Sequence, residues 1–572
     1  MQQKIQTFLL GLCLLPIVLV INGAVPGVMA PTMGQALWIT SFAQSFAKDV
    51  SIYAHNFGLP QPAPISFGLS LAFPQAVLIY IGIEPLLAYV VICACWLSLA
   101  YWGAYSFSRW IGAGRAASLF GGLVWSTLPI IWTHQSYSAL AFGIALLPFY
   151  FWFAFRLVSG DSRPAASVGF VAACLIAVFM DGYTFMMLAA GTGLALICEI
   201  VRHRRNWTSL IFRCCVVAVG LGAAYVAYVR YEGILDFGGI SVDFFRAWGA
   251  NVEFFVTPTK GLLTLPDLIG WGKERAPEMY FGDGSVYTTT FAAVLIAFAF
   301  YALCSGNTQP KFRTALVLIA IFGFWLSLGP TVKIFTHRPD GTIDPLMPEQ
   351  YGMFPSGNEW LINLPGFQSM RASYRWAALG MFGCWAIVVS MMATESLPKI
   401  NKAWLLAALL AFNVPATSQI QSYQSYQDRI GDFLAEMSSW APYFHKGETV
   451  AFLPYSNDFL ANTAANELDF RTYNIGGDKN QTAAQHYWPD EMNVFPIGQH
   501  GPNFASNVQA LLDSGKADAV VFPYIDMLWA SHLWPVPDNQ KADLEPVARQ
   551  IDENSRYDVQ YAPHFAIIRV KR

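Results

Sequence analysis

Residues 166–201 read ASVGFVAACLIAVFM-DG-YTFMMLAAGTGLALICEIV, which is two apolar runs separated only by Asp181-Gly182. A membrane-spanning helix needs roughly 20 mostly apolar residues. Two such runs joined by two residues predict a tight re-entrant hairpin in a membrane. One long broken helix is the alternative interpretation.

The same apolar pattern repeats through residues 1–417. Hydrophobic residues make up 55% of the chain and charged residues 12%, and the mean hydropathy is +0.40, whereas a soluble chain carries about 25% charged residues. We therefore predict a polytopic α-helical membrane domain of about 11 transmembrane helices. The expected spans are 5–23, 84–107, 116–133, 139–157, 166–180, 183–201, 208–229, 286–304, 314–330, 373–393 and 403–417.

The basic residues between these spans predict the orientation of the chain. The connectors at 134–138 and 181–182 carry no Lys or Arg, and the positive-inside rule places basic connectors in the cytoplasm. The N-terminus is thus expected in the cytoplasm and the C-terminus outside. Val28-Met29-Ala30 resembles a signal-peptide cleavage site, but the first run is nearly long enough to span, so we favour an uncleaved anchor. The basic residues that flank one face are Lys4, Arg109, Arg115, Arg156, Arg163, Arg202, Arg204, Arg205, Lys311, Arg313, Lys399 and Lys402.

Long polar segments are predicted only on the outer face, so any chemistry is expected there. They are the loops 24–83, 231–285 and 331–372 and the terminal segment 418–572. The terminal segment alternates helical and strand patterns, which predicts a small extracytoplasmic α/β domain. Its middle, 471–500, is expected to be irregular. The helices are predicted at 423–440, 504–514 and 543–554, and the strands at 449–455, 519–524, 557–562 and 565–570.

Charge and cysteine usage exclude several classes of function. The net charge is -3 and the pI about 6.3, which does not favour a nucleic-acid partner. All nine cysteines lie in or at the end of a predicted span, so neither a disulfide framework nor a metal site is indicated. No cofactor is certain, and a divalent cation is left open as one.

Two outer acids are candidate site residues. Asp49 ends a predicted amphipathic helix at 32–53 that is expected to lie in the membrane interface, with Lys48 beside it and His55 nearby. Asp181 lies at membrane depth in the tightest outer connector, where an ionisable group indicates a site. A solvated loop acid and a helix-end turn residue are the respective alternatives. Most of the eight acids of the second outer loop are expected to be solvated.

Two outer arginines stand at the start of the tenth span. Arg371 and Arg375 are four residues apart, a spacing that would place them on one helix face. Arginine on the outer side opposes the positive-inside trend. A fork of N–H donors suits a phosphate, and snorkelling to lipid headgroups is the alternative.

The arrangement resembles the GT-C superfamily of glycosyltransferases that use polyprenyl-phosphate sugars, and within it bacterial YfhO-like membrane proteins. The stretches that carry the resemblance are Asn56-Phe57-Gly58-Leu59-Pro60, then Phe254–Pro258 with Tyr280-Phe281-Gly282, and Leu364-Pro365-Gly366-Phe367 with the two arginines.

The resemblance implies an inverting membrane glycosyltransferase in the bacterial inner membrane. It would move a sugar from a lipid-linked donor to an envelope glycan, lipid or protein acceptor on the outer face. Asp49 would be the catalytic base, and Arg371 and Arg375 would bind the donor phosphate, while Lys48, His55 and Asp181 are further substrate-binding candidates. No second acid accompanies Asp49, which weakens a metal role.

Two other classes of function remain open. One is a transporter or flippase for a lipid or solute, although no inverted repeat is visible. The other is a non-catalytic scaffold for envelope assembly.

Overall fold

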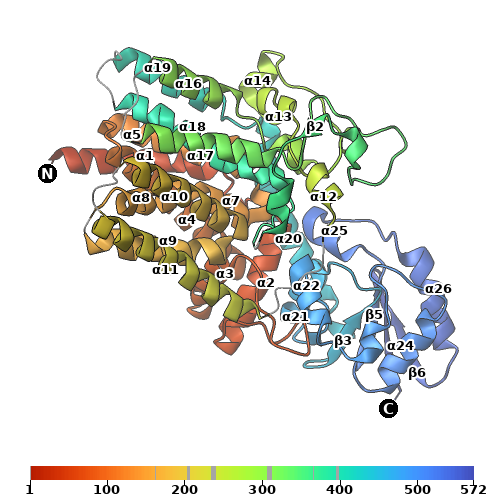
Figure 1. Ribbon diagram of the computed structural model, residues 1–572. Helices are drawn as coiled ribbons and strands as arrows, with labels where there is room; N and C mark the ends of the chain where they lie inside the picture. The colour runs from red at the N-terminus through yellow and green to blue at the C-terminus, as the bar shows by residue number, and fades with distance from the viewer. Residues whose placement is uncertain are drawn as a thin grey trace. The chain divides into compact units, whose positions relative to one another are not determined.

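The computed structural model describes residues 2–161, 163–202, 207–233, 240–305, 312–364, 366–393 and 399–571. The chain divides into two compact units. The membrane unit comprises residues 1–25, 93–228 and 238–422, and the sheet unit comprises residues 26–92, 229–237 and 423–572 (Figure 1).

Apolar helices form most of the membrane unit. Five described helical stretches are long and apolar enough to cross a membrane by length and composition, namely Pro85–Trp110, Gln135–Val158, Gly182–Arg202, Thr208–Glu232 and Ser373–Met392. The helices are α1 (Gln2–Ile21), α4 (Pro85–Trp110), α5 (Arg115–Ser126), α6 (Pro129–Trp132), α7 (Ser138–Ala145), α8 (Leu147–Val158), α9 (Pro164–Met180), α10 (Gly182–Arg202), α11 (Trp207–Glu232), α15 (Ser285–Thr288), α16 (Ala293–Cys304), α17 (Arg313–Ser327), α18 (Ala377–Met392) and α19 (Lys399–Ala411).

Each predicted span contains helix, but the bounds differ. The segment 116–133 breaks between α5 and α6 because Leu128 precedes Pro129, and a residue before proline is disfavoured in the helical region. The first outer loop also holds an apolar helix that was not expected as a separate element, α3 (Leu69–Tyr80). The number of spans stays a prediction.

The helical hairpin of the opening stretch is present. α9 ends at Met180, Asp181 is extended with φ -162° and ψ 138°, and α10 begins at Gly182. The two helices pack against each other and against α8. The tight re-entrant turn is therefore confirmed over one long broken helix.

Small residues let α17 and α18 pack closely in the middle of the membrane unit. A Cβ on Gly323 would lie 2.2 Å from the backbone nitrogen of Gly380, and one on Gly383 would lie 2.7 Å from that of Ala320. Every residue of α18 is buried. Close backbone approach through small residues is how membrane helices gain packing energy without a hydrophobic driving force between them.

Short elements form the second and third loops of the membrane unit. They are α12 (Val242–Ala247), α13 (Val252–Val256), α14 (Thr264–Leu268), the antiparallel strands β1 (Thr331–Val332) and β2 (Phe354–Pro355), and 3-10 turns at Pro277–Met279, Glu349–Tyr351 and Glu359–Asn363. Two further 3-10 turns, Gln135–Tyr137 and Ser373–Trp376, precede α7 and α18.

A five-stranded sheet in the order β4-β3-β5-β7-β6 organises the sheet unit. β3 pairs in parallel with β4 and β5, and β7 pairs antiparallel with β5 and β6. α24 and α26 pack against β5 and β7. The strands are β3 (Thr449–Phe452), β4 (Arg471–Thr472), β5 (Ala519–Pro523), β6 (Tyr557–Tyr561) and β7 (Phe565–Val570), and the helices of the terminal segment are α20 (Thr417–Ser439), α21 (Phe459–Glu467), α22 (Asp478–Gln485), α23 (Asp490–Asn493), α24 (Phe504–Asp513), α25 (Met527–Leu533) and α26 (Lys541–Asp552), with a 3-10 turn at Ala441–Tyr443.

The expected strands and helices of the terminal segment are present, with shifts of a few residues at their ends. The expectation of an irregular middle is wrong in part, because α22 and α23 form there. The polar composition of α22 concealed its helical pattern.

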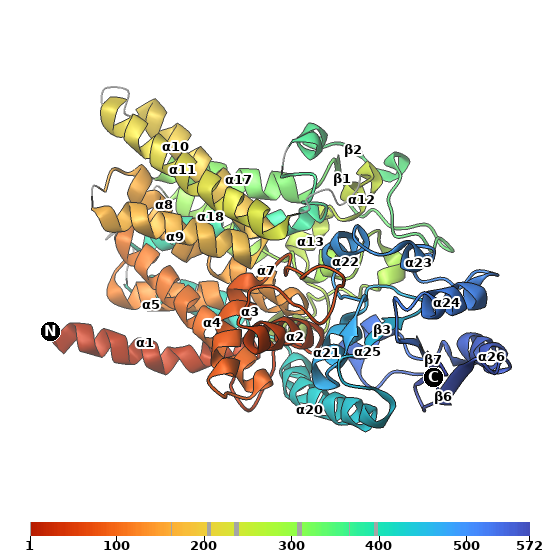
Figure 2. The same cartoon turned by 90° about the horizontal axis from the view of Figure 1, so that it is seen from below.

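The first outer loop folds together with the terminal segment. α2 (Gly34–Asp49) packs against α3, α21 and α25 (Figure 2), and residues 56–59 run beside β4, where the N–H of Thr472 donates to the carbonyl of Asn56 at 2.9 Å. Most of α2 is buried, including the polar Gln35 and Ser41. The expected interfacial amphipathic helix is therefore wrong, since its polar face contacts protein. A single domain boundary at 417/418 also does not describe these contacts.

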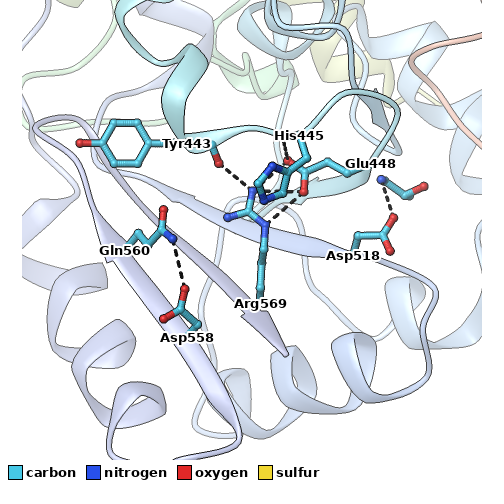
Figure 3. A network of polar contacts seen from close by, with 8 residues as sticks. Tyr443, His445, Glu448, Asp518, Asp558, Gln560 and Arg569 are labelled. Atoms are coloured by element: carbon cyan, nitrogen blue, oxygen red, sulfur yellow. Dashed lines mark hydrogen bonds and ion pairs between the residues drawn. The ribbon is translucent and has the colours of Figure 1, made fainter. Parts of the chain in front are cut away.

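A buried ion pair closes the end of the sheet (Figure 3). The guanidinium of Arg569, on β7, donates to both carboxylate oxygens of Glu448 at 2.9 and 3.1 Å and to the carbonyl of Tyr443 at 2.7 Å. The N–H of His445 donates to Glu448 at 2.8 Å. These bonds hold β7 to the turn that precedes β3.

Candidate functional site

Arg375 is surrounded by tyrosine rings in the membrane unit. Its guanidinium carbon lies 4.7 Å from the ring centre of Tyr137, 4.9 Å from that of Tyr183 and 5.7 Å from that of Tyr374. Aromatic faces attract a cation within about 6 Å. We name these four residues the arginine–tyrosine cluster.

Three chain segments bring the cluster together. Tyr137 ends the 3-10 turn before α7, Tyr183 lies in the first turn of α10, and Tyr374 and Arg375 lie in the 3-10 turn that leads into α18. The hydroxyl of Tyr183 accepts the N–H of Ala372 at 2.8 Å, which ties the start of α10 to this turn.

A directional chain of hydrogen bonds fixes one side of the guanidinium. Ser285 donates its hydroxyl to the carboxylate of Asp283, so its oxygen accepts from Tyr374 at 2.6 Å. The Tyr374 oxygen then accepts the Nε–H of Arg375 at 3.3 Å. The Trp248 indole also donates to Asp283, at 3.0 Å.

The other side of Arg375 has no hydrogen-bond partner among the residues that the structure describes. Within the described part of the chain, Arg375 forms no ion pair with a carboxylate, and its Nη groups make no hydrogen bond. A cation inside a protein is costly unless it is paired. Aromatic faces offset part of that cost, and the two Nη groups form a fork that an anion can occupy.

His134 borders the cluster with an unpaired nitrogen. Its ring stacks on Tyr374 at 5.8 Å and an angle of 6°, and its Nδ1 lies 2.6 Å from the carbonyl of Ile130. This carbonyl can only accept, so Nδ1 carries the proton. Nε2 is buried and lacks a partner among the residues that the structure describes.

Arg371 does not share a helix face with Arg375. It precedes the 3-10 turn that begins at Ser373, and its guanidinium lies 5.0 Å from the ring of Phe244. The helical spacing expected for the two arginines is therefore wrong, because α18 begins only at Ala377.

Asp181 caps α10 beside the cluster. Its Oδ1 accepts the N–H groups of Tyr183 at 2.8 Å and Thr184 at 3.4 Å. A carboxylate at this position satisfies backbone donors and the helix dipole. Asp181 thus accepts the backbone N–H of Tyr183, and Arg375 lies over the ring of the same residue.

The other three candidates belong to the sheet unit. Asp49 is exposed at the end of α2, and Lys48 pairs with Asp469 at 2.6 Å. This bond holds the pKa of Asp469 below its ordinary value. His55 is exposed, with Nε2 3.4 Å from the hydroxyl of Ser51. Their roles in a reaction stay predictions.

A pocket in the sheet unit contains an acid that sequence reasoning did not select as a site residue. The pocket has a volume of about 320 Å³, and Glu232 in its wall is only 4% exposed. Glu232 ends α11, where an acid opposes the helix dipole. An acid at the C-terminal end of a helix is the sequence feature that could have indicated this site. The lining residues are Tyr53, Gly58, Gln61, Pro62, Ala63, Pro64, Tyr231, Glu232, Gly233, Asn480, Ala483, Ala484 and Tyr487.

No group of three or more His, Cys, Asp or Glu side chains suited to a metal ion converges among the residues that the structure describes.

No protein-family model matches the chain, and no curated protein matches it. Several solved structures are similar. The apo oligosaccharyltransferase of Archaeoglobus fulgidus is 12% identical with a TM-score of 0.50, over 90% of this chain and 69% of that one. ArnT of Cupriavidus metallidurans, bound to undecaprenyl phosphate, is 12% identical with a TM-score of 0.48, over 99% and 98%. The mycobacterial arabinofuranosyltransferase AftD is 10% identical with a TM-score of 0.49, over 98% and 41%.

The similarity to the archaeal protein concerns the fold. The chain shares the fold of that oligosaccharyltransferase, and five of its described helical stretches are long and apolar enough to cross a membrane.

Proposed function

We propose that this protein is a membrane glycosyltransferase that moves a sugar from a polyprenyl-phosphate donor to an envelope glycan, lipid or protein acceptor on the outer face of a bacterial inner membrane. The observation that carries the proposal is Arg375, a cation among three tyrosines with no carboxylate partner in the described chain. The shared fold supports it, because the archaeal protein is named an oligosaccharyltransferase. The YfhO-like subfamily stays a prediction.

The proposed reaction is a single displacement. The acceptor hydroxyl oxygen attacks the anomeric carbon, its proton passes to the carboxylate of Asp49, and the bond from the anomeric carbon to the phosphate oxygen breaks with its electron pair. The configuration at the sugar inverts. A positioned base and a donor fork at the leaving phosphate both lower the barrier.

Arg375 suits the leaving group by its geometry. Its Nε is held by Tyr374, so the two Nη groups keep a fixed direction toward a phosphate. Arg371 is the second proposed phosphate ligand, and its guanidinium lies over the ring of Phe244. Lys48, His55 and Asp181 are proposed to contact substrate.

The test is sugar transfer from synthetic polyprenyl-phosphate sugars by purified protein in lipid nanodiscs. Wild type is compared with Arg375→Lys, Asp49→Asn and, as a matched exposed acid of the sheet unit, Asp490→Asn. We expect transfer by wild type and Asp490→Asn, with large losses in the other two.

Other outcomes assign the function differently. Equal transfer by wild type and Asp49→Asn would support the enzyme class but contradict the assignment of Asp49 as the base. Asp181 would then be tested as the base. Absence of transfer across a broad donor panel contradicts the proposal. Movement of a lipid-linked sugar between leaflets in the same preparation would then indicate a flippase, and its absence a scaffold.

A further inference from the structure

The pocket of the sheet unit contains a buried acid, Glu232, with one carboxyl oxygen that lacks a hydrogen-bond partner in the described chain. Ser66 donates its hydroxyl to Oε1 of Glu232, whereas Oε2 is buried without a hydrogen-bond partner among the described residues. A buried acceptor without a donor costs free energy, so it requires an explanation. A ligand hydroxyl in the pocket would supply the missing donor.

The wall around Glu232 is rigid. The Tyr231 hydroxyl accepts the N–H of Ile65 at 2.9 Å and donates to the carbonyl of Ile52 at 3.0 Å. Asn480 donates its amide to the carbonyl of Pro64 and accepts the N–H of Ser66 at 3.4 Å. These bonds hold the first outer loop, the end of α11 and α22 in place around the pocket, so the site is formed without a ligand.

The remaining lining groups combine aromatic faces with hydrogen-bonding side chains. Tyr53 and Tyr487 present rings, and Tyr487 is 47% exposed. Gln61 adds an amide at the rim. The C–H face of a sugar ring packs on an aromatic ring, while its hydroxyls donate to carboxylate and amide oxygens. Such pockets combine a few polar groups with apolar walls.

The volume of the pocket and the polar groups that line it restrict the class of ligand. Binding pockets range from roughly 300 to 1,000 Å³, so about 320 Å³ lies at the small end, where one or two sugar rings fit and a long glycan does not. Lys479 lies close enough to act electrostatically on Glu232, and the Glu232 Oε2 atom without a hydrogen-bond partner in the described chain suits a hydroxyl donor. We infer that this pocket binds an uncharged sugar ring, with Glu232 accepting a hydrogen bond from a ring hydroxyl and Tyr487 stacking on the ring.

The inference rests on the proposed function for the source of that sugar, which is either the acceptor glycan or the transferred residue of the donor. The experiment measures binding separately from transfer. Saturation-transfer-difference NMR is recorded on full-length protein in nanodiscs with a panel of neutral mono- and disaccharides. The variants are Glu232→Gln, Tyr487→Ala and, as an exposed acid of the same unit, Glu553→Gln.

We expect a saturable signal in wild type and Glu553→Gln. The signal should weaken about tenfold in Glu232→Gln, since the amide replaces one carboxyl oxygen with an N–H group that cannot accept the ligand hydroxyl, and also in Tyr487→Ala. The exposed Tyr487 can be replaced without disturbing the fold, and unchanged unfolding midpoints verify that in each variant. An equal signal in all four proteins, or no signal from any sugar, overturns the inference.

Failure of the pocket and failure of the proposed function give different results. Transfer activity without any pocket-dependent signal contradicts the inferred sugar pocket and supports the proposed glycosyltransferase function. A pocket-dependent signal without transfer supports the inferred sugar pocket and contradicts the proposed glycosyltransferase function. Where both are present, inhibition of transfer by the bound sugar that is competitive with the acceptor identifies the acceptor as the source, and inhibition competitive with the donor identifies the donor.

Discussion

Arg375 shows how a charged side chain can be stabilised inside the protein without a carboxylate partner in the described chain. Its three tyrosines stabilise the cation through their ring faces and supply no negative charge that a phosphate would have to displace. A carboxylate in their place would compete with the ligand.

The Tyr374 hydroxyl gives a direct test of this arrangement. Tyr374→Phe keeps the ring but removes the acceptor of the Arg375 Nε–H and the connection to Ser285. We expect binding of undecaprenyl phosphate to weaken about tenfold, and more in Arg375→Lys, which loses the fork. Fluorescence titration in nanodiscs measures both. Tyr301→Phe, at an exposed tyrosine of α16, is the control, and equal affinities in all proteins would remove Tyr374 from the site.

Asp458 predicts a pH dependence of stability. It is buried at the start of α21, and burial raises the pKa of its carboxyl from 3.8 to about 7, even though Asn474 donates to it at 2.6 Å. The folded pKa lies above the unfolded one, so the stabilisation is fully present below about pH 4. It is lost as the pH rises through 7.

Asp458→Asn should remove this dependence, because an amide does not titrate. At about 1.4 kcal/mol per pKa unit, we expect the wild-type free energy of unfolding to fall by a few kcal/mol between pH 4 and pH 7.5 relative to the variant. Thermal unfolding in detergent across this range measures the difference, with exposed Asp490→Asn as the control. Parallel curves for wild type and Asp458→Asn would contradict the assignment.

At the scale of elements, the end of the sheet depends on the pair formed by Glu448 and Arg569. Their side chains are 6% and 14% exposed. Removing one partner leaves a buried charge, so Arg569→Ala is expected to cost about 3–5 kcal/mol.

The pair of Arg549 and Glu545 on α26, with side chains 68% and 22% exposed, offers a more solvated control. Arg549→Ala removes the same side chain from a solvated pair, and such pairs contribute little. Chemical denaturation followed by a probe in the sheet unit should separate the two variants. Equal loss in both would mean that the pair of Glu448 and Arg569 does not hold β7 in place.

The local sequence pattern predicted where most helices and strands lie, but it did not predict what each of them packs against. The apolar runs and the terminal strands were predictable because membrane helices and buried strands are apolar throughout. The environment of α2 was not predictable, since its buried Gln35 and Ser41 are polar residues and α2 is buried by packing against α3, α21 and α25.

The same limit applies to the candidate site. Arg375 was predictable because it opposes the charge trend of the connectors. Tyr137 and Tyr183 were not selected, although their segments, 134–138 and 181–183, fall on the same predicted face as the start of the tenth span. Topology alone could thus have suggested the arginine–tyrosine cluster. The exposure of Asp49 and the burial of Glu232 depend on tertiary packing that one sequence does not show.

At the scale of the whole molecule, the positive-inside pattern predicts a cytoplasmic N-terminus and an outer C-terminus, and the proposed chemistry requires both. Alkaline phosphatase needs disulfides that form only in an oxidising compartment. When it is joined after residue 572, we expect it to be active, and a green fluorescent protein exported unfolded to the same place to be dark. Joined within the basic connector at 306–311, the two reporters should exchange their behaviour. The opposite pattern would place the sheet unit in the cytoplasm, where an outer envelope acceptor could not reach Asp49 or the Glu232 pocket, and both proposals would fail together.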